Sequence, residues 1–334
     1  MGLTRLTFDH FTAFRSLDIS LSPGINAFIG TNGTGKTHLM KVAYLAAEIT
    51  KTKPEISSRL ISLFLPYERR IGRLVHRQKG STRGAFEIFR GDQRLRISFS
   101  NHAKTEVHGV GVKDWISGDA IESAYIPVKE MLAQAPGFRS LYAAREIHFE
   151  SIYADIVDRA FLPVLRGRVG PDRKKLLTSL TEAMDGKVIV KNETFFLKNK
   201  RGELEFSLLA EGSRKLALLW LLLQNGTLID GSILFWDEPE ANLNPKILGS
   251  LVQILLDLER LGVQIFLATH NYVLLEELNL RAREENELCY FSLHRRNGEI
   301  DCAHADRLQD LAPNAIADTF VSLYDREIRR SAGL

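Results

Sequence analysis

The stretch that decides the fold is Gly30-Thr31-Asn32-Gly33-Thr34-Gly35-Lys36-Thr37. Its glycines and its closing Lys-Thr pair have the G-x-x-x-x-G-K-[ST] spacing of a phosphate-binding loop. An apolar run, Ile25 to Ile29, precedes it, and a helical pattern runs from Lys36 to about Ile49. A strand, a glycine-rich loop and a helix in this order are the context that the motif requires. An accidental glycine-rich turn is the much weaker interpretation.

Each residue type in this loop suits a bound triphosphate. Glycines let backbone N–H groups curl around phosphate oxygens at the start of a helix. Lys36 would contact the β- and γ-phosphates, and the Thr37 hydroxyl would be a ligand of Mg²⁺. The sequence therefore predicts ATP and Mg²⁺ as cofactors. The loop residues predicted to bind the nucleotide are Gly30, Thr31, Asn32, Gly33, Thr34, Gly35, Lys36 and Thr37.

A second apolar strand ends in two acids. Ile233-Leu234-Phe235-Trp236 runs directly into Asp237 and Glu238. A strand buried on both faces has no reason to end in paired carboxylates unless they meet a cation or a reacting group. Asp237 is the predicted metal partner of Mg²⁺, and Glu238 is the predicted base that polarises the attacking water. A helix cap after the strand is the alternative.

A third apolar run, Val263 to Ala268, is followed by Thr269 and His270. A lone histidine is more often a structural residue than a catalytic one. His270 follows Glu238 by 32 residues, and this spacing suggests the end of a neighbouring strand. We therefore predict His270 as a catalytic residue that senses the γ-phosphate.

The N-terminal segment predicts an antiparallel lobe. Apolar and polar residues alternate from Leu3 to Phe14 and from Leu17 to Leu21, which predicts two antiparallel strands at a sheet edge. Two further alternating runs flank Gly91-Asp92 and predict a hairpin. Together with the buried strands that carry motifs at their carboxyl ends, this order predicts an α/β P-loop fold.

The middle of the chain changes to a helical pattern. Helical periodicity runs over 129–182, with one turn-rich interruption at 166–171. We interpret this part as a helical subdomain inserted into the ATPase. The expected segments are an N-terminal lobe at 1–128, the insertion with its connecting strands at 129–206, and a C-terminal lobe at 207–334.

In combination these motifs resemble those of ABC-type ATPases. Asp237-Glu238-Pro239, Ala241-Asn242-Leu243-Asn244 and Thr269-His270 are similar to the Walker B, D-loop and switch-histidine series. Asn32 and Phe14-Arg15-Ser16 narrow the resemblance to the SMC/RecF/OLD branch. Leu209-Ala210-Glu211-Gly212-Ser213-Arg214-Lys215 falls where that branch has its signature motif. The chain looks most like compact ATPases of bacterial anti-phage defence, such as OLD-type heads and the Septu ATPase subunit.

The resemblance implies a head with an antiparallel β lobe, an inserted helical subdomain and a homodimer around ATP. In these ATPases the signature motif contacts the γ-phosphate bound to the partner head, so Gly212 and Ser213 would donate to that phosphate from a helix N-terminus. Hydrolysis would then release the two heads. The resemblance also implies Arg15 as a nucleotide-binding residue. A plain helix cap is the alternative for Gly212-Ser213.

Two positions depart from the family pattern. Ala210 stands where a serine is usual, so one hydroxyl contact is missing unless Ser213 replaces it, and we expect slow turnover. The strand before the insertion ends without the usual glutamine that touches Mg²⁺ and water; Gln134 lies further along. Lys129 or Glu130 would act there instead, or the contact would be absent.

Charge is concentrated in one place. The chain carries a net charge of only +3, whereas 68–104 holds ten Lys or Arg residues against three acids, a local excess of +7. Such a stretch fits the phosphate backbone of nucleic acid or an acidic partner. A solvated hairpin is the equally simple alternative, because its aromatic residues alternate like core residues. Both interpretations stay open.

The predicted location is the cytoplasm, with no membrane association. Cys289 and Cys302 flank a hairpin turn at Asn297-Gly298 whose register places Cys302 opposite Leu293, so a disulfide is not expected. The N-terminus alternates like a strand instead of a signal peptide. The longest apolar run, Leu216 to Leu223, is too short to span a bilayer.

The chain is expected to act with a separate effector. Only 64 residues follow His270, and no carboxylate cluster resembles a two-metal nuclease. The favoured hypothesis is an ATP-gated dimeric ATPase, with the possibility of larger assemblies, in anti-phage defence. The second is a RecF-like DNA-repair ATPase that binds DNA directly. A transporter subunit and a non-hydrolysing nucleotide sensor are further alternatives.

Overall fold

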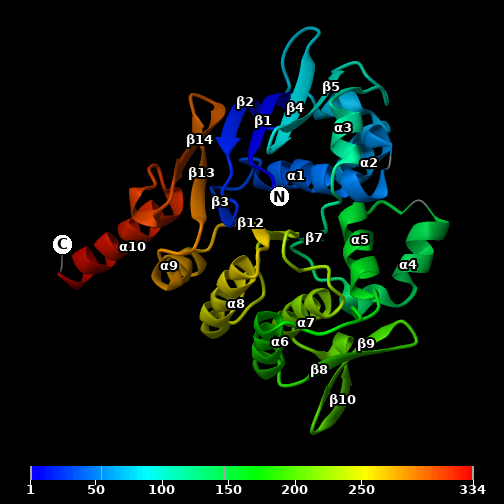
Figure 1. Ribbon diagram of the computed structural model, residues 1–334. Coiled ribbons are helices and arrows are strands. Elements are labelled where there is room, and N and C mark those ends of the chain that lie inside the picture. Colours follow the sequence, from blue (N-terminus) through cyan, green and yellow to red (C-terminus); the bar gives the residue numbers. More distant parts are fainter. Residues whose placement is uncertain (1, 54, 146, 333–334) are drawn as a thin grey trace.

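The computed structural model describes residues 2–53, 55–145 and 147–332. A six-stranded sheet in the order β14-β13-β3-β12-β11-β7 lies at its centre (Figure 1). Neighbouring strands are parallel except in the β13–β14 hairpin. The strands are β3 (Ile25–Ile29), β7 (Ser123–Ile126), β11 (Ile233–Asp237), β12 (Gln264–Thr269), β13 (Leu288–Arg296) and β14 (Glu299–Ala305). The predicted α/β P-loop fold is confirmed.

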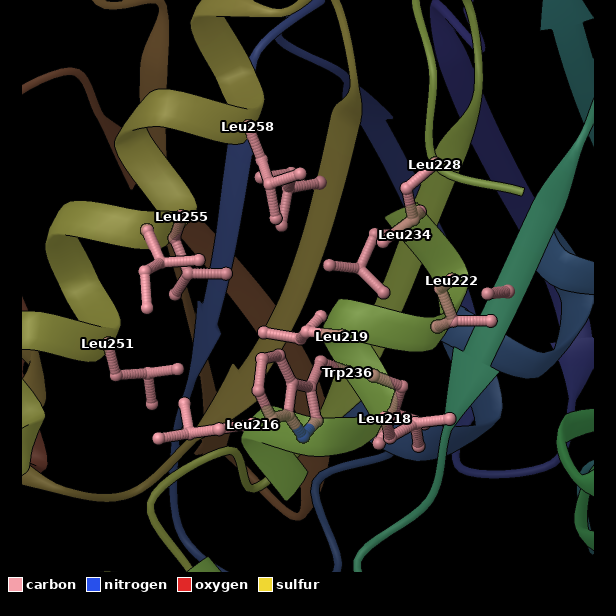
Figure 2. Close-up of a cluster of buried hydrophobic side chains, with 14 of the residues drawn as sticks. Leu216, Leu218, Leu219, Leu222, Leu228, Leu234, Trp236, Leu251, Leu255 and Leu258 are labelled. Carbon is pink, nitrogen blue, oxygen red and sulfur yellow. The ribbon is translucent and has the colours of Figure 1, made fainter. Parts of the chain in front are cut away.

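Alternate side chains of the central strands enter two different cores. Phe235 and Phe266 face one side, with ring centroids 4.8 Å apart, and share a core with α1. Leu234 and Trp236 face the other side and pack against leucines of α7 and α8 (Figure 2). The covering helices are α1 (Lys36–Thr52), α7 (Glu211–Gln224) and α8 (Leu248–Arg260). Burial on both faces explains why these strands are unbroken apolar runs.

A second, five-stranded sheet is antiparallel, in the order β2-β1-β4-β5-β6. Its strands are β1 (Arg5–Phe11), β2 (Phe14–Ser20), β4 (Arg83–Arg90), β5 (Gln93–Ser100) and β6 (His108–Val110). The hairpin at Gly91-Asp92 is confirmed. The predicted end of the first strand is wrong: the chain already turns at Thr12-Ala13, because Phe11 and Phe14 pair across the turn and both bury their rings. Only β2 of this pair lies at the sheet edge.

Between β7 and α7 lies the predicted helical insertion, with a small sheet of its own (Figure 1). It contains α4 (Ala135–Ala144), α5 (Ser151–Ala160), α6 (Pro171–Ala183), β8 (Lys187–Lys191), β9 (Thr194–Asn199) and β10 (Gly202–Glu205). The structure adds a second break, between α4 and α5, where Glu150 pairs with Lys41 of α1. The boundaries at 128 and 206 stay a prediction; the central sheet takes strands from both outer segments.

Buried charges join α1 to the insertion. Glu48 of α1 pairs with Arg59 of α2 (Ile56–Phe64) and lies 3.1 Å from an Arg159 nitrogen of α5. The Tyr44 hydroxyl donates to Asp155 at 3.0 Å, and Asp155 also pairs with Arg59. Both guanidinium groups lie 5.8 Å from the centre of the Tyr44 ring. Removing one partner would leave a buried charge uncompensated, so these ion pairs hold the two parts together.

The C-terminal part completes the sheet and then leaves it. The Asn297-Gly298 hairpin is confirmed, with Leu293 opposite Cys302, and both cysteines are free thiols. Helix α9 (Tyr272–Arg281) precedes the hairpin, and α10 (Ala315–Ser331) follows it and projects from the body (Figure 1). The Phe320 ring of α10 stacks on Tyr272 at 4.3 Å. Within the described ranges, no helix is both long and apolar enough to cross a membrane.

The core between α7, α8 and the sheet allows a first prediction. Leu255 of α8 is fully buried, so Leu255→Ala should leave a cavity and lower the free energy of unfolding by about 2–5 kcal/mol. Leu280 of α9 is 77% exposed, and Leu280→Ala should change that free energy by less than about 0.5 kcal/mol. Denaturant unfolding of both variants measures the difference; equal losses would contradict this placement of Leu255.

Candidate functional site

The glycine loop joins β3 to α1 and has the backbone shape that its glycines allow. Gly35 has a φ of 92°, and a Cβ there would lie 2.6 Å from the Phe14 ring. The Lys36 ammonium donates to the carbonyl of Gly30 at 2.7 Å and to that of Thr31 at 3.2 Å. Burial lowers the pKa of Lys36, and the charges of the nearby acids oppose this shift. Lys36 is thus a buried cation at the centre of the loop. Thr31, Asn32 and Gly33 are exposed, and Thr34 is buried.

The predicted metal ligands come together although 200 residues separate them. The Thr37 hydroxyl donates to Asp237 Oδ2 at 2.8 Å, and the Tyr125 hydroxyl of β7 donates to the same oxygen at 3.3 Å. Burial raises the pKa of Asp237, while these hydrogen bonds lower it. A hydroxyl and one carboxylate fit Mg²⁺, which takes its remaining oxygens from phosphates and water. Tyr125 was not predicted, although the strand that carries it was.

The predicted catalytic pair also meets. His270 Nδ1 lies 3.3 Å from Glu238 Oε1, because β11 and β12 are parallel neighbours whose carboxyl ends share an edge. Glu238 has a φ of 48°, a left-handed conformation that is rare for a residue with a side chain. Glu240, which was not predicted, accepts from the Thr269 hydroxyl at 2.6 Å and the His270 amide at 3.3 Å. Burial raises the pKa of Glu240. This carboxylate fixes the backbone that carries His270.

Helix α7 begins one residue before the predicted Gly212-Ser213 N-terminus. The helix begins at Glu211 with Ala210 as its cap residue, so Gly212 and Ser213 lie inside its first turn. A Cβ on Gly212 would lie 2.6 Å from a terminal methyl of Leu243, so a side chain here would require the Leu243 side chain to move. The first amide of α7 to reach an acceptor four residues back is that of Arg214, at 3.2 Å from the Ala210 carbonyl. The preceding amides have no such acceptor within the helix and are free to bind an anion.

Two arginines flank the glycine loop differently from the prediction. Arg15 lies 3.8 Å from Glu299 of β14, and no hydrogen bond or ion pair joins it to the described loop residues, so its role in nucleotide binding stays a prediction. Arg295 of β13, which was not predicted, donates to the Gly33 carbonyl at 3.3 Å. Its position in the sequence did not indicate this contact, because Arg295-Arg296 resembles an ordinary pair of basic residues before a hairpin turn.

Neither Lys129 nor Glu130, the two candidates to replace the missing glutamine, contacts the predicted metal ligands Thr37 and Asp237 in the described part of the chain. Glu130 turns towards α7, where its carboxylate lies 2.7 Å from Arg214 Nε. No contact of Lys129 with Thr37 or Asp237 is found within the described ranges. The insertion approaches α1 through another acid, Glu150, which lies 2.5 Å from Lys41, one turn after Thr37. Long-range pairs of this kind leave no signal in local spacing.

The basic stretch is divided by the fold. Arg90 is buried over the Trp115 ring, and Glu87 pairs with Arg94 and Arg96. The alternating Phe86, Ile88, Leu95, Ile97 and Phe99 are core residues, as predicted. Other cations of the stretch are on the surface: Arg69, Arg70, Arg73, Arg77, Lys79, Arg83 and Lys104. A nucleic-acid interface at 68–104 therefore stays a prediction that rests on these exposed cations.

A glycine loop, a hydroxyl–carboxylate pair and an acid–histidine pair at one edge of a parallel sheet define a P-loop fold of the ABC-ATPase type. The chain belongs to the family described as "AAA domain, putative AbiEii toxin, Type IV TA system", whose model matches residues 96–276, more than half of the chain. The matched region contains the α7, β11 and β12 motifs and begins after the glycine loop.

Solved structures agree on the fold. A structure of an SMC head bound to the C-terminal winged-helix domain of ScpA superposes with a TM-score of 0.57, at 12% identity, over 92% of this chain and 99% of that one. An SMC head with an extended coiled coil, bound to the C-terminal domain of ScpA from Pyrococcus furiosus, gives 0.55 at 11% identity over 98% and 99%. These low identities show a shared fold alone.

Sequence relatives are DNA replication and repair proteins RecF. The protein of Glaesserella parasuis is 29% identical over 104 residues, which is 31% of this chain and 29% of RecF. That of Streptococcus suis is 32% identical over 104 residues, 31% and 28% of the two chains. The chain thus matches under a third of the length of these relatives.

The position of Lys36 generates a prediction about ligand binding. Lys36→Ala removes the buried cation of the loop, so ATP binding should weaken at least about 100-fold, a loss typical of a charge-assisted phosphate contact in a buried site. Lys51→Ala, which removes an exposed lysine near the far end of α1, should bind ATP like the parent. Titration calorimetry with ATP and Mg²⁺ compares the three proteins. Parent-like affinity of Lys36→Ala would remove this loop as the nucleotide site.

Proposed function

We propose that this protein binds ATP with Mg²⁺ and hydrolyses it to ADP and phosphate. The observation that carries the proposal is the convergence of two pairs of side chains at the sheet edge where β3, β11 and β12 end. Thr37 is hydrogen-bonded to Asp237, and His270 lies at ion-pair distance from Glu238. Ligands bind at this edge in open parallel sheets. The buried Lys36 supplies a positive charge at the same edge.

Each residue has one role in the proposed reaction. Lys36 and the loop amides bind the β- and γ-phosphates, and Thr37 with Asp237 would hold Mg²⁺, which neutralises the charge of the leaving phosphates. Glu238 orients the water and accepts its proton as the water oxygen attacks the γ-phosphorus and the bond to the β-phosphate oxygen breaks. His270, beside Glu238, would contact the γ-phosphate. Ala210 has no hydroxyl to contact the γ-phosphate, which is consistent with slow turnover.

The proposed active form is a homodimer with two ATP molecules between the subunits. The first amides of α7, including those of Gly212 and Ser213, would donate to the γ-phosphate bound by the partner's glycine loop. These proposed contacts are supported by the unpaired amides at the start of α7 and by the resemblance to ABC-type ATPases. Within the described residues, the first turn of α7 contacts Asn242 and Leu243. Through Arg214 it also contacts Phe206 and Glu130, and none of these contacts is with its own glycine loop.

In the cell, we propose that the ATP state of this dimer gates a separate effector in anti-phage defence, in the cytoplasm. The resemblance to OLD-type and Septu ATPases supports this role, and the family description names a putative toxin of a toxin–antitoxin system. One solved neighbour is an SMC head bound to a domain of another protein, ScpA, which offers a precedent for an effector on a separate chain.

A RecF-like DNA-repair role is the second candidate. It is supported by the identity of 29–32% to RecF over 104 residues and by the exposed cations of 68–104. In this alternative, duplex DNA would contact the basic surface directly through its phosphates.

Glu238→Gln separates binding from hydrolysis. The amide cannot accept the proton, so hydrolysis should fall by at least about 100-fold, within the range of general-base losses, while ATP binding persists. The variant should accumulate as an ATP-bound dimer, visible as a doubling of mass in light scattering after size exclusion. Asp301→Asn, at an exposed position of β14, should behave like the parent. A Glu238→Gln protein that stays monomeric with saturating ATP would exclude the shared-nucleotide dimer.

ATPase stimulation decides between the two biological roles. With an effector-gating role, naked duplex DNA should leave the ATPase rate unchanged, and the co-purifying partner should alter it. With a RecF-like role, duplex DNA should raise the rate, and the effect should fall steeply between about 50 and 200 mM salt, as expected for contacts to phosphates. Arg77→Ala with Arg83→Ala tests whether any stimulation requires the basic surface.

A further inference from the structure

We propose that the segment 66–78 carries a binding site for an unpaired nucleotide, in which a cationic hollow holds the phosphate and the Tyr67 ring stacks on the base. The segment joins α2 to β4 and contains two short helical turns, Tyr67–Arg69 and Ile71–Leu74. The inference goes beyond the proposed function, because it requires neither ATP hydrolysis nor the dimer. It also differs from the DNA-repair alternative, in which a duplex is contacted through its phosphates.

The backbone of this segment has an unusual conformation. Glu68 and Arg69 both have a φ of 55°, in the left-handed region that is rare for residues with a side chain. Such residues persist where the surrounding structure imposes them, and they occur often at ligand-binding sites. The Ile71 amide donates to the Lys104 carbonyl at 2.8 Å, which anchors the segment to the loop after β5. This anchored turn leaves Tyr67 69% exposed.

On the side of the second helical turn lies a hollow of about 430 Å³ whose polar lining residues all carry hydrogen-bond donors. They are Arg73, His76, Arg77, Gln78 and Asn101. Of these side chains, His76 alone has a carboxylate nearby in the described part of the chain, that of Glu299 at 3.8 Å. Arg73 and Arg77 form no ion pair within the described residues, so their charge is available to an anion. The hollow therefore suits a phosphate group.

A second hollow, of about 500 Å³, adjoins Tyr67 and lies between the end of α2 and residues 142–149. Its described lining includes the aromatic residues Tyr67, Tyr142 and Phe149 and the charged residues Glu68, Arg69 and Arg145. Aromatic rings stack on bases of every kind. These three rings lie outside the basic stretch 68–104, whose alternating aromatic residues are in the core. The fold thus supplies the stacking surface that the basic stretch itself lacks.

Arg73 and Tyr67 join the two hollows. The Arg73 guanidinium lies 5.4 Å from the centre of the Tyr67 ring, and Arg73 lines the cationic hollow whereas Tyr67 lines the aromatic one. The phosphate and the base of one nucleotide can therefore bind side by side. In a duplex the bases are stacked inside the helix, so only an unpaired base reaches the ring.

The surroundings of the two hollows favour a strand over a free nucleotide. Further exposed cations continue the surface beyond the cationic hollow: Arg70, Lys79 and Arg83. A mononucleotide has one phosphate group, whereas a strand offers one phosphate per residue to such a row of cations. Single-stranded nucleic acid is the ligand that uses both the rings and all of these charges.

Fluorescence anisotropy without ATP tests the inference directly. The probes are a labelled thymidine oligonucleotide of about 12 residues and a duplex of the same length, at about 50 mM salt. The parent should bind the single strand at least about fivefold more tightly than the duplex, the gain from one base stack. Thymidine monophosphate is the competitor. Displacement only at much higher concentration than the unlabelled oligonucleotide identifies a strand as the ligand, and equal displacement identifies a free nucleotide at the same site.

Tyr67→Ala removes the ring at an exposed position. Binding of the single strand should weaken by about fivefold to a hundredfold, the range for one base–aromatic stack, and duplex binding should stay unchanged. Tyr67→Phe keeps the ring and should bind like the parent. Tyr324→Ala, at a tyrosine of α10 that is 63% exposed, is the matched control and should also bind like the parent.

Arg73→Gln combined with Arg77→Gln tests the phosphate hollow. For the single strand, the slope of log affinity against log salt should become shallower by about 1.4, the value for two phosphate contacts. Arg329→Gln combined with Arg330→Gln, at two exposed positions of α10, removes the same charge elsewhere and should leave this slope unchanged.

The outcomes separate this inference from the proposed function, because ATP is absent. Equal affinity of the parent for single strand and duplex, or parent-like single-strand affinity in a Tyr67→Ala protein that circular dichroism shows to be folded, overturns the inference. No binding of either nucleic acid, or an unchanged salt slope in the double arginine variant, also overturns it. A protein that hydrolyses ATP without binding the single strand loses this inference alone, and one that binds the strand without hydrolysing ATP loses the proposed function alone.

Discussion

The hydrogen bond between Thr37 and Asp237 is the contact on which the rest of the site depends. Asp237 ends β11, and Thr37 lies in the first turn of α1, directly after the glycine loop that follows β3. Only β12 separates β3 from β11 in the sheet, so parallel pairing of these three strands brings a hydroxyl, two carboxylates and a histidine to one edge. That pairing in turn requires strands that are apolar on both faces, with α1 on one side and α7 and α8 on the other. The core therefore determines the geometry of the chemistry directly.

The same physical logic explains how much the sequence could predict. Fully buried strands such as 233–237 and 264–269 are unbroken apolar runs, so their existence, their order and the acids and histidine at their ends were accessible from periodicity and spacing. The first hairpin turn was misplaced because alternation continues across Thr12-Ala13, and only the tertiary burial of Phe11 and Phe14 fixes the turn. Local patterns are read along the chain, whereas packing decides between neighbouring registers.

Contacts between distant segments explain what the sequence could not provide. The pairs Lys41–Glu150 and Arg214–Glu130 join residues far apart in the chain, and each side chain alone looks like an ordinary surface charge. Tyr125 and Glu240 gain their roles from burial beside Asp237 and Thr269. In the proposed dimer, the nucleotide contacts of α7 likewise require a second subunit. The insertion and the head are thus joined by electrostatics that only the folded chain creates.

The packing of Gly212 against Leu243 has a consequence for how related sequences are compared. A side chain at this position would meet a methyl of Leu243 within a single subunit and would require that side chain to move. Packing alone would consequently favour a glycine here, even in a descendant that had lost every nucleotide contact at this helix. Retention of that glycine among relatives is evidence of an intact fold, and inheritance of enzymatic activity has to be traced through the acid and the histidine instead.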